Sequence, residues 1–368
     1  MPRPMATNSA NSNRTLSQHY LGGEKGFQII SCEAQEGLAK RLVQYNPARF
    51  QYHPTKWGKF PDGTDNIEIG GYTPENKIRG EHVLFLASFH NNDVTLSQFH
   101  VIQTLCESFI ETLTVALPYY PTGTMERVIK EGQVATASTL ARLFSNLPRI
   151  GKPIRVAVYD LHTLQNRFYL SGNALASMHS GIPMLLKELR KATSKVNCVA
   201  FPDEGACKRF GYIFQEEFPD WPVVICGKVR DGEKRIVTIQ DGDPKGKHCI
   251  IVDDMIDTAG TLCKSAETLM EMGAKSVSAC ATHGLLTGPA MDRIKKSCMA
   301  HVIVSDSIPL KPGAPDKIKV VSVAGLIAEA IQCMTTGQSV SGLFALPSPV
   351  LQASMKQAAS CGKPPKMP

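Results

Sequence analysis

The sequence has no long hydrophobic run, and this lack excludes one class of protein. No window in the 368 residues approaches the ~18 consecutive apolar residues that a transmembrane helix needs, so we expect no membrane partner. Residues 1–14 are polar and have no apolar segment of the kind that a secretory signal carries. We therefore expect a cytoplasmic protein.

Paired cysteines and a concentrated basic face are also missing. The 11 cysteines are scattered singly without a C-x-x-C pair, which indicates small buried side chains rather than a disulfide scaffold. The net charge is +7, but residues 1–25 hold three basic residues against one acid, and residues 346–368 hold three lysines and no acid. A duplex-binding protein concentrates positive charge on a folded face. We therefore expect no nucleic-acid partner.

Between two polar ends, short β-like runs alternate with helical patterns. The candidate strands are 27–31, 82–89, 114–120, 155–160, 198–202, 248–254, 276–282 and 301–306. The candidate helices include 34–45, 95–111 and 261–272, the last with Gly273 as its C-cap. This alternation predicts an α/β fold with mostly parallel sheet flanked by helices, and the length predicts about two domains.

The most informative segment for chemistry is 249–262, where an apolar run ends in Asp253 and Asp254. A short loop follows and opens a helix; its residues are Asp257, Thr258, Ala259, Gly260 and Thr261. Free N–H groups and the dipole of a helix start favour a phosphate, whereas carboxylates suit sugar hydroxyls or a divalent cation. The segment therefore predicts a site for ribose 5-phosphate. The alternative is an ordinary strand–turn–helix with acidic residues in its loop.

The string from Val252 to Thr261 resembles the phosphoribosyl-pyrophosphate loop shared by type I phosphoribosyltransferases and ribose-phosphate diphosphokinases (phosphoribosyl-pyrophosphate synthetases). Residues 281–290 and 326–341 resemble the diphosphokinases, and residues 121–142 and 202–210 resemble their plant-type subclass. The resemblance covers residues 26–345. It implies two similar type I phosphoribosyltransferase-like α/β domains with the active site between them.

The domain limits that we expect combine this resemblance with the composition of the chain. They are a disordered tail (1–25), an N-terminal domain on the nucleotide side (26–168), a C-terminal domain with the ribose-phosphate loop (169–319), a segment that packs on the N-terminal domain (320–345) and a flexible tail (346–368).

The resemblance also implies roles for individual side chains. Lys228 and Arg230 match the K-x-R of the family's mobile catalytic loop and would stabilise the transferring group. His162, in a D-L-H motif, and Asp203, in P-D-x-G, would place the Mg²⁺ of the nucleotide. Asp253 and Asp254 would hold the ribose hydroxyls, and the loop 257–261 would hold the 5-phosphate. On their own, His162 could be a structural imidazole and Lys228 with Arg230 a solvated hairpin.

The nucleotide side departs from the family pattern. Phe60 and Asp62 match the aromatic residue and the first acid of R-F-x-D-G-E, but Thr64 stands in place of the final Glu. Of the two arginines in the family's A-R-Q-D-R, the second has a counterpart in Arg127. The plant-type subclass is known for independence from phosphate activation and for a looser choice of diphosphoryl donor, and the lost contacts agree with looser choice.

The function that we expect is Mg²⁺-dependent transfer of the diphosphoryl group of ATP to the 1-hydroxyl of ribose 5-phosphate, which gives 5-phosphoribosyl 1-diphosphate and AMP for nucleotide synthesis and salvage. Such transfer depends on positioning and charge stabilisation, so a missing Ser–His or Cys–His signature is expected. The alternatives are a catalytically inactive regulatory relative and a phosphoribosyltransferase. The resemblance also implies a homo-oligomer, whether trimer, dimer-based or hexamer.

Overall fold

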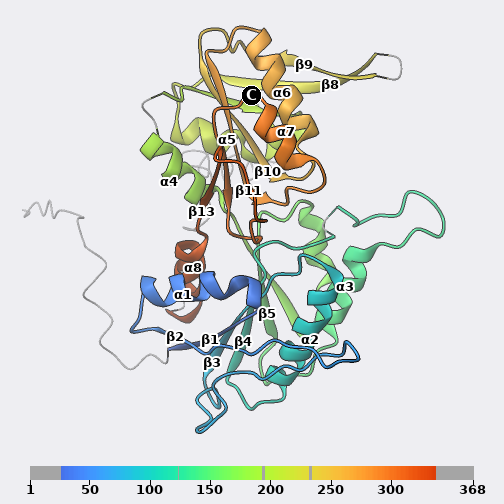
Figure 1. Cartoon of the computed structure of the whole chain (residues 1–368), viewed down its shortest axis with the longest axis vertical. Helices are drawn as coiled ribbons and strands as arrows, with labels where there is room; N and C mark the ends of the chain where they lie inside the picture. Colours follow the sequence, from blue (N-terminus) through green and yellow to red (C-terminus); the bar gives the residue numbers. More distant parts are fainter. Residues whose placement is uncertain (1–25, 123, 193–194, 232–233, 337–368) are drawn as a thin grey trace, which may run out of the picture.

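The computed structural model describes residues 26–122, 124–192, 195–231 and 234–336. Two sheets form the centres of two lobes, one above the other in Figure 1. The tails expected at 1–25 and 346–368 lie outside the described residues, as do residues 337–345 of the expected C-terminal segment. Within the described ranges, none of the helices combines the length and apolar character that crossing a membrane requires.

The first sheet has six strands, and all of its neighbouring strands are parallel. In spatial order they are β2 (Phe50–Tyr52), β1 (Phe27–Ser31), β3 (His82–Leu86), β4 (Thr112–Ala116), β5 (Ile154–Tyr159) and β6 (Ala174–His179). Its interior strands β3 and β4 are almost entirely buried, because helices cover both faces of the sheet.

The second sheet has seven strands and one antiparallel pair. In spatial order they are β13 (Ile318–Val321), β12 (Val302–Ser305), β11 (Ser276–Gly284), β10 (His248–Ile256), β7 (Cys198–Phe201), β8 (Val223–Asp231) and β9 (Lys234–Asp241). If β9 is set aside, β8-β7-β10-β11-β12-β13 repeats the connectivity of β2-β1-β3-β4-β5-β6. The two halves therefore share one chain path.

The helices follow the strands in an alternating order. They are α1 (Glu36–Tyr45), α2 (Asn92–Cys106), α3 (Thr136–Ser145), α4 (Ile182–Ala192), α5 (Glu204–Glu217), α6 (Gly260–Glu271), α7 (Ala290–Lys296) and α8 (Ala324–Thr336), with 3-10 turns at Glu33–Gln35 and Leu164–Tyr169. The α/β class and the two similar mostly parallel domains expected from the sequence are confirmed.

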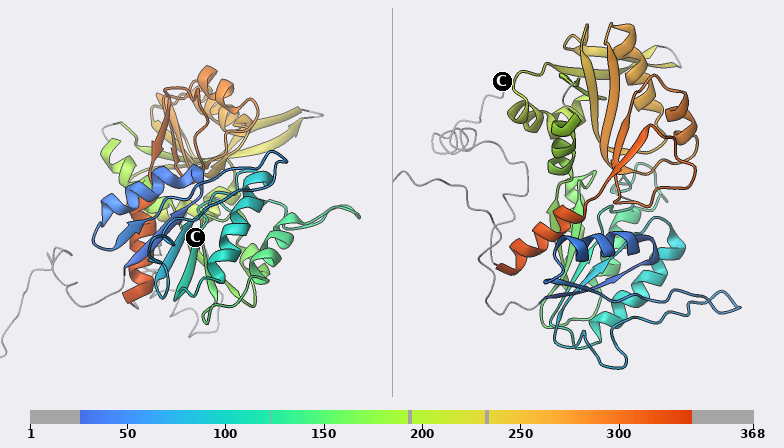
Figure 2. Two further views of the ribbon diagram at one scale, coloured as in Figure 1. Left: turned by 60° about the horizontal axis from the view of Figure 1, so that its bottom comes forward. Right: turned by 60° about the vertical axis from the view of Figure 1, so that its left-hand side comes forward.

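One apolar cluster joins the two sheets. It contains Leu38 and Leu42 of α1, Tyr159 of β5, Phe201 of β7 and Ile327 of α8, all almost fully buried. Helix α8 returns from the second lobe and lies beside α1 of the first, as the right-hand view of Figure 2 shows.

Two expectations need correction. The first sheet continues through β6, whose strand pairs with β5 along its whole length, so the expected boundary at residue 168 falls too early. The segment of β6, A-L-A-S-M-H, has no β-branched residue, so its sequence gives little strand signal. Lys228 and Arg230 lie on strand β8, paired with Val237 and Arg235 of β9, rather than in a loop.

Candidate active site

The carboxyl end of β10 carries the two adjacent acids. Asp253 is partly buried and Asp254 is 5% exposed, and both lie within the strand, which runs two residues further than expected. Helix α6 begins at Gly260, directly after the loop. The structure therefore brings the carboxylates and the helix start together at one edge of the sheet, as expected for a ligand site of an open α/β sheet.

The loop before α6 is held from outside by the segment that follows β11. Thr287 donates its hydroxyl to Asp257 Oδ1 and its N–H to Asp257 O (3.1 Å), and Arg293 Nη1 donates to Thr258 O (3.0 Å). A cavity of about 430 Å³ lies beside the loop, with Thr258, Thr261 and Arg293 among its lining residues. The loop that we expected to bind phosphate is thus fixed before any ligand arrives.

Gly260, the first residue of α6, has no Cβ at a point where space is limited. The left-handed backbone is at Ala259 (φ 58°), the residue that precedes α6, and not at Gly260. A Cβ at 260 would lie 3.2 Å from Arg293 Nη1, so a larger residue would have to shift that guanidinium group.

Asp254 is the centre of a network that joins the two domains. Its Oδ2 accepts hydrogen bonds from His162 Nδ1 (2.8 Å) and Arg209 Nη1 (2.9 Å). His162 follows β5 of the first domain, whereas Arg209 lies on α5 of the second. Arg209 Nη2 also lies 3.9 Å from Asp160 Oδ1. The structure therefore places His162 and Asp254 in contact, although 92 positions separate them.

The charges of this network shift the pKa values of its members in opposite directions. Burial alone raises the pKa of Asp254, but the hydrogen bond from His162 and the charge of Arg209 outweigh it and hold the pKa below its usual value. The hydrogen bond with Asp254 raises the pKa of His162. Burial, followed by the charge of Asp254, raises the pKa of Asp253. At neutral pH the geometry favours an ionised Asp254 beside a more protonated Asp253.

Sequence reasoning missed two residues of this site. Asp160 is 5% exposed and accepts hydrogen bonds from Ser180 Oγ (2.7 Å), Gly181 N (2.7 Å) and the hydroxyl of Thr282 in the second domain. Arg209 makes the ion pair with Asp254. The available signal was their place in motifs already singled out: Asp160 precedes Leu161-His162, and Arg209 is in the segment 202–210.

Asp203 has a local structural role. Its Oδ1 accepts the N–H of Ala206 (3.0 Å) and caps the N-terminus of α5. Its charge also contributes to the raised pKa of Asp253, so the two carboxylates face a common region.

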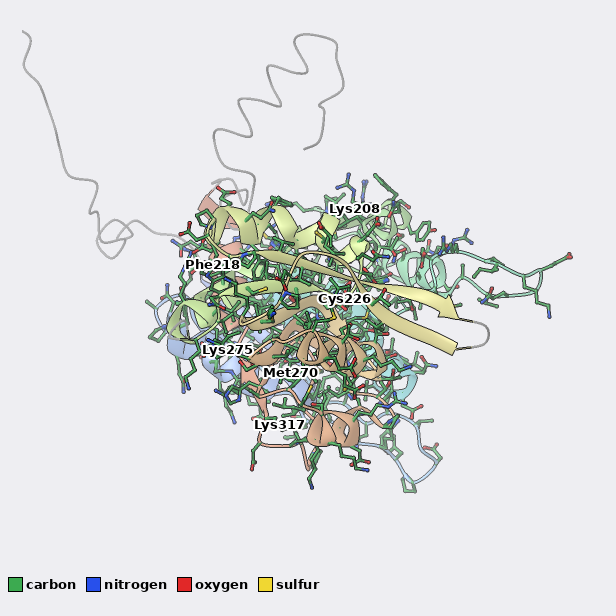
Figure 3. The ribbon with its side chains drawn as sticks, turned by 90° about the horizontal axis from the view of Figure 1, so that it is seen from above. Lys208, Phe218, Cys226, Met270, Lys275 and Lys317 are labelled. Carbon is green, nitrogen blue, oxygen red and sulfur yellow. The ribbon has the colours of Figure 1, made fainter. Side chains whose placement is uncertain are left out.

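The antiparallel strands β8 and β9 extend outward from the second domain, as Figure 3 shows from above. Lys228 and Arg230 lie two residues apart on β8.

The residues expected on the nucleotide side come from other projecting segments. Phe60 and Asp62 lie in a hairpin, 57–65, which points away from the first domain in the right-hand view of Figure 2. Thr64 donates its N–H (2.9 Å) and its hydroxyl (2.7 Å) to Asp62 Oδ1, which lowers the pKa of that acid. Arg127 is exposed and lies 3.5 Å from Glu126. The structure does not bring Phe60 and Asp62 to the Asp254 network of their own chain.

Comparisons with known proteins agree with the geometry. Residues 27–147 match the family model described as the N-terminal domain of ribose phosphate pyrophosphokinase, and residues 224–345 match the phosphoribosyl synthetase-associated domain. The chain is 39% identical over 324 residues to ribose-phosphate pyrophosphokinase 3, chloroplastic, of Oryza sativa subsp. japonica, which covers 85% of this chain and 77% of the rice protein. It is 39% identical over 321 residues to ribose-phosphate pyrophosphokinase 4 of Arabidopsis thaliana, which covers 84% of this chain and 93% of that protein.

A solved structure supports the same assignment. The phosphoribosylpyrophosphate synthetase of Mycobacterium smegmatis superimposes with a TM-score of 0.72 at 25% identity, over 85% of this chain and 100% of that one. The two-domain path, the β10–α6 loop and the relatives thus agree, and the resemblance to the plant-type subclass is confirmed. The chain belongs to the ribose-phosphate pyrophosphokinases, the enzymes that transfer the diphosphoryl group of ATP to the 1-hydroxyl of ribose 5-phosphate.

Proposed function

We propose that this chain binds ribose 5-phosphate at the β10–α6 edge. Asp253 and Asp254 accept hydrogen bonds from the ribose hydroxyls, and the loop Asp257–Thr261 holds the 5-phosphate. The observation that carries this proposal is the fixed loop at the start of α6, which Arg293 and Thr287 hold beside the two acids. The N–H groups at the start of a helix attract an anion, and the adjacent carboxylates accept from a sugar.

The same edge fits Mg²⁺ held partly by substrate. The described residues contain no cluster of three metal-ligating side chains, but Mg²⁺ commonly takes one or two carboxylates, water and phosphate oxygens. Burial and the charge of Asp254 raise the pKa of Asp253, and a cation would relieve that repulsion. His162 is oriented through Nδ1 by Asp254, an arrangement common for metal-bound histidines. We assign the Mg²⁺ to His162 and Asp203, near Asp253, with water and phosphate oxygens as its other ligands; when bound, it would neutralise phosphate charge.

Lys228 and Arg230 are the catalytic residues in this proposal. Transfer of a diphosphoryl group spreads negative charge over its oxygens, and nearby fixed cations stabilise that charge more in the transition state than in the ground state. Their place on β8, which extends outward with β9 from the second domain, fits an arm that covers the bound substrates.

Phe60, Asp62 and Arg127 are the residues that we assign to the nucleotide. The hydrogen bonds from Thr64 hold Asp62 Oδ1 within its own hairpin, so one acceptor that a base could use is already occupied. A site with fewer polar contacts rejects the wrong base less strongly. We propose that GTP, CTP or UTP also support transfer, and that activity persists without free phosphate. Measuring kcat/KM for the four nucleotides in phosphate-free buffer tests both statements.

The projecting hairpin also supports a homo-oligomer. Phe60 is 50% exposed at its tip, and Ile129, in the loop that extends from the first domain in Figure 1, is 84% exposed. Apolar side chains on segments that leave the body fit contact with a second copy, and Phe60 and Asp62 would then serve the site of a neighbour. Light scattering after size-exclusion chromatography measures the number of subunits, whether trimer, dimer-based or hexamer.

We propose the cytosol as the compartment, although the rice relative's name places that protein in the chloroplast and a Spinacia oleracea relative's name places that one in the mitochondrion. Imaging of a C-terminal fluorescent fusion of the full chain decides among the three.

One assay tests the proposed site. AMP release from ATP is measured with and without ribose 5-phosphate over a Mg²⁺ titration, in the wild type and in Asp253→Asn. We expect dependence on both components and a raised KM for ribose 5-phosphate in the variant. An unchanged KM would place the ribose elsewhere.

A further inference from the structure

The first domain contains a cavity whose lining includes none of the residues assigned above to the transfer reaction. Its volume is about 420 Å³, within the range of small-molecule sites. It lies between the end of β1 and the start of α2, with Cys32, Ala34, Val94 and Gln98 among its walls and Trp57 on the base of the 57–65 hairpin. Phe60 and Asp62 are not among its lining residues.

The position of this cavity follows from the strand order. In β2-β1-β3-β4-β5-β6 the path from β1 turns toward β2, whereas the path from β3 turns toward β4. Leu38 and Leu42 of α1 belong to one core cluster, and Val101 and Leu105 of α2 belong to another on the opposite face. The two connections therefore diverge between β1 and β3. In open α/β sheets such a switch point leaves a crevice where ligands bind.

The floor and one wall of the cavity are apolar or already satisfied. Cys32 is 3% exposed, and burial raises the pKa of its thiol to about 12, so it stays uncharged. Gln98 is 1% exposed and bonds through its amide to Ser88 N (2.9 Å), Ser88 O (2.8 Å) and Val94 O (2.9 Å). Trp57 is held by a hydrogen bond from Nε1 to Ser31 O (3.3 Å). A fixed aromatic ring beside such a floor fits a flat ring system.

The charged side chains that line the cavity indicate which ligand charge it can accept. Lys59 Nζ pairs with Asp65 Oδ1 (3.1 Å), which also accepts from Ser97 Oγ (2.9 Å). Lys59 and Asp65 balance each other's charge. Of the two acids that line the cavity, this leaves the exposed carboxylate of Glu33 without a balancing cation in the lining. A carboxylate repels a phosphate and accepts hydrogen bonds from an amino group.

We propose that this cavity binds an uncharged heteroaromatic base that carries an amino group, such as adenine, with its ring against Trp57 and its amino group toward Glu33. The ligand is a free nucleobase or nucleoside rather than a nucleotide. It would contact the base of the hairpin whose tip carries Phe60, so occupancy would fix the hairpin against α2. This site is separate from the one that binds ATP, and its binding can be measured without turnover.

Tryptophan emission reports on the site directly. The chain has 2 tryptophans, Trp57 and Trp221, so the variant Trp221→Phe leaves Trp57 as the single reporter. Adenine, adenosine, AMP and unsubstituted purine are titrated into this variant. We expect saturable quenching by adenine and adenosine, about tenfold weaker binding of purine through the lost contact to Glu33, and weaker binding of AMP than of adenosine.

Two variants that fill the cavity are compared with a matched control, all on the Trp221→Phe background. Val94→Phe and Ala34→Leu add volume to the lining from two different elements, α2 and the 3-10 turn after β1. Leu96→Phe adds volume on α2 at a residue that is 61% exposed and does not line the cavity. Circular dichroism melts identify folded variants. Quenching that is lost in either folded filling variant and kept in Leu96→Phe supports the site. Absence of saturable quenching, equal quenching in all variants, or tighter binding of AMP than of adenosine would overturn the proposal.

Discussion

Replacing Arg209 tests the network that joins the domains. In Arg209→Met the buried carboxylate of Asp254 loses its guanidinium donor, whereas His162 remains at 2.8 Å. A hydrogen bond to a charged group contributes about 1.5–3 kcal/mol. The partner that stays keeps the loss below the ~3–5 kcal/mol of a fully unpaired buried charge. We expect a loss of about 2 kcal/mol, or about 4–8 °C in Tm for a domain of roughly 150–250 residues.

A neighbouring lysine provides the control. Lys208 lies next to Arg209 on α5, and its side chain is 75% exposed in an ion pair with Glu204. Lys208→Met removes the same charge from the solvent side and should cost less than about 0.5 kcal/mol. Arg209→Lys retains the charge and should recover part of the loss. Urea unfolding of the three variants gives the comparison.

The stability difference between the wild type and Arg209→Met should depend on pH. The pKa of Asp254 is lowered in the folded state, so its stabilising effect is complete above its unfolded pKa of about 3.9 and is lost as the pH falls through the lower folded value. The difference between wild type and Arg209→Met should be full at neutral pH and shrink in acid. Equal stability of Arg209→Met and Lys208→Met at neutral pH would refute the reasoning.

Three further predictions concern the loop, the arm and a buried histidine. Gly260→Val should weaken ribose 5-phosphate at least about tenfold by calorimetric titration, because its side chain would displace Arg293, 3.2 Å from a Cβ at that position; unchanged affinity would place the phosphate elsewhere. Lys228→Ala and Arg230→Ala should each lower kcat about 10²–10³-fold with unchanged melting, as steady-state kinetics will show; near-normal turnover in both would end their assignment. Burial lowers the pKa of His179 to about 4, so below about pH 6.5 the unfolded chain binds more protons than the folded one. The free energy of unfolding should therefore fall by about 2 kcal/mol from pH 7 to pH 5. In His179→Gln, urea unfolding at the two pH values should show this fall missing.

The sequence predicted elements best where composition and period agree. Apolar runs such as 248–254 are confirmed as strands because a parallel sheet covered on both faces needs uninterrupted apolar residues. Helix α2 begins at Asn92, three residues before the expected 95–111, because Asn91 caps it through a side-chain bond to Val94 N. It ends at Cys106, earlier than expected. Strand β2 is three residues long and gave no usable pattern.

The candidate site could likewise be predicted from the sequence only in part. Asp253, Asp254 and the loop 257–261 are contiguous, so one segment of sequence defines their neighbourhood. Contacts between distant segments leave no local pattern. Nothing near Arg209 in the sequence indicates that it bonds to Asp254, 45 positions away, and the place of Gly260 against Arg293 depends on the packing of α7 on α6.

The apolar cluster shared by the two sheets restricts how the molecule can move. A hinge that opened the lobes would expose side chains such as Leu42, Tyr159 and Phe201 to water, at about 25 cal/mol for each Å² uncovered. We therefore expect substrate entry and product release to depend on the segments that carry little of this cluster, the hairpin 57–65 and the arm β8–β9. We expect the two lobes to remain one rigid frame during turnover, while displacements on the nanosecond-to-microsecond scale of loops open and cover the site.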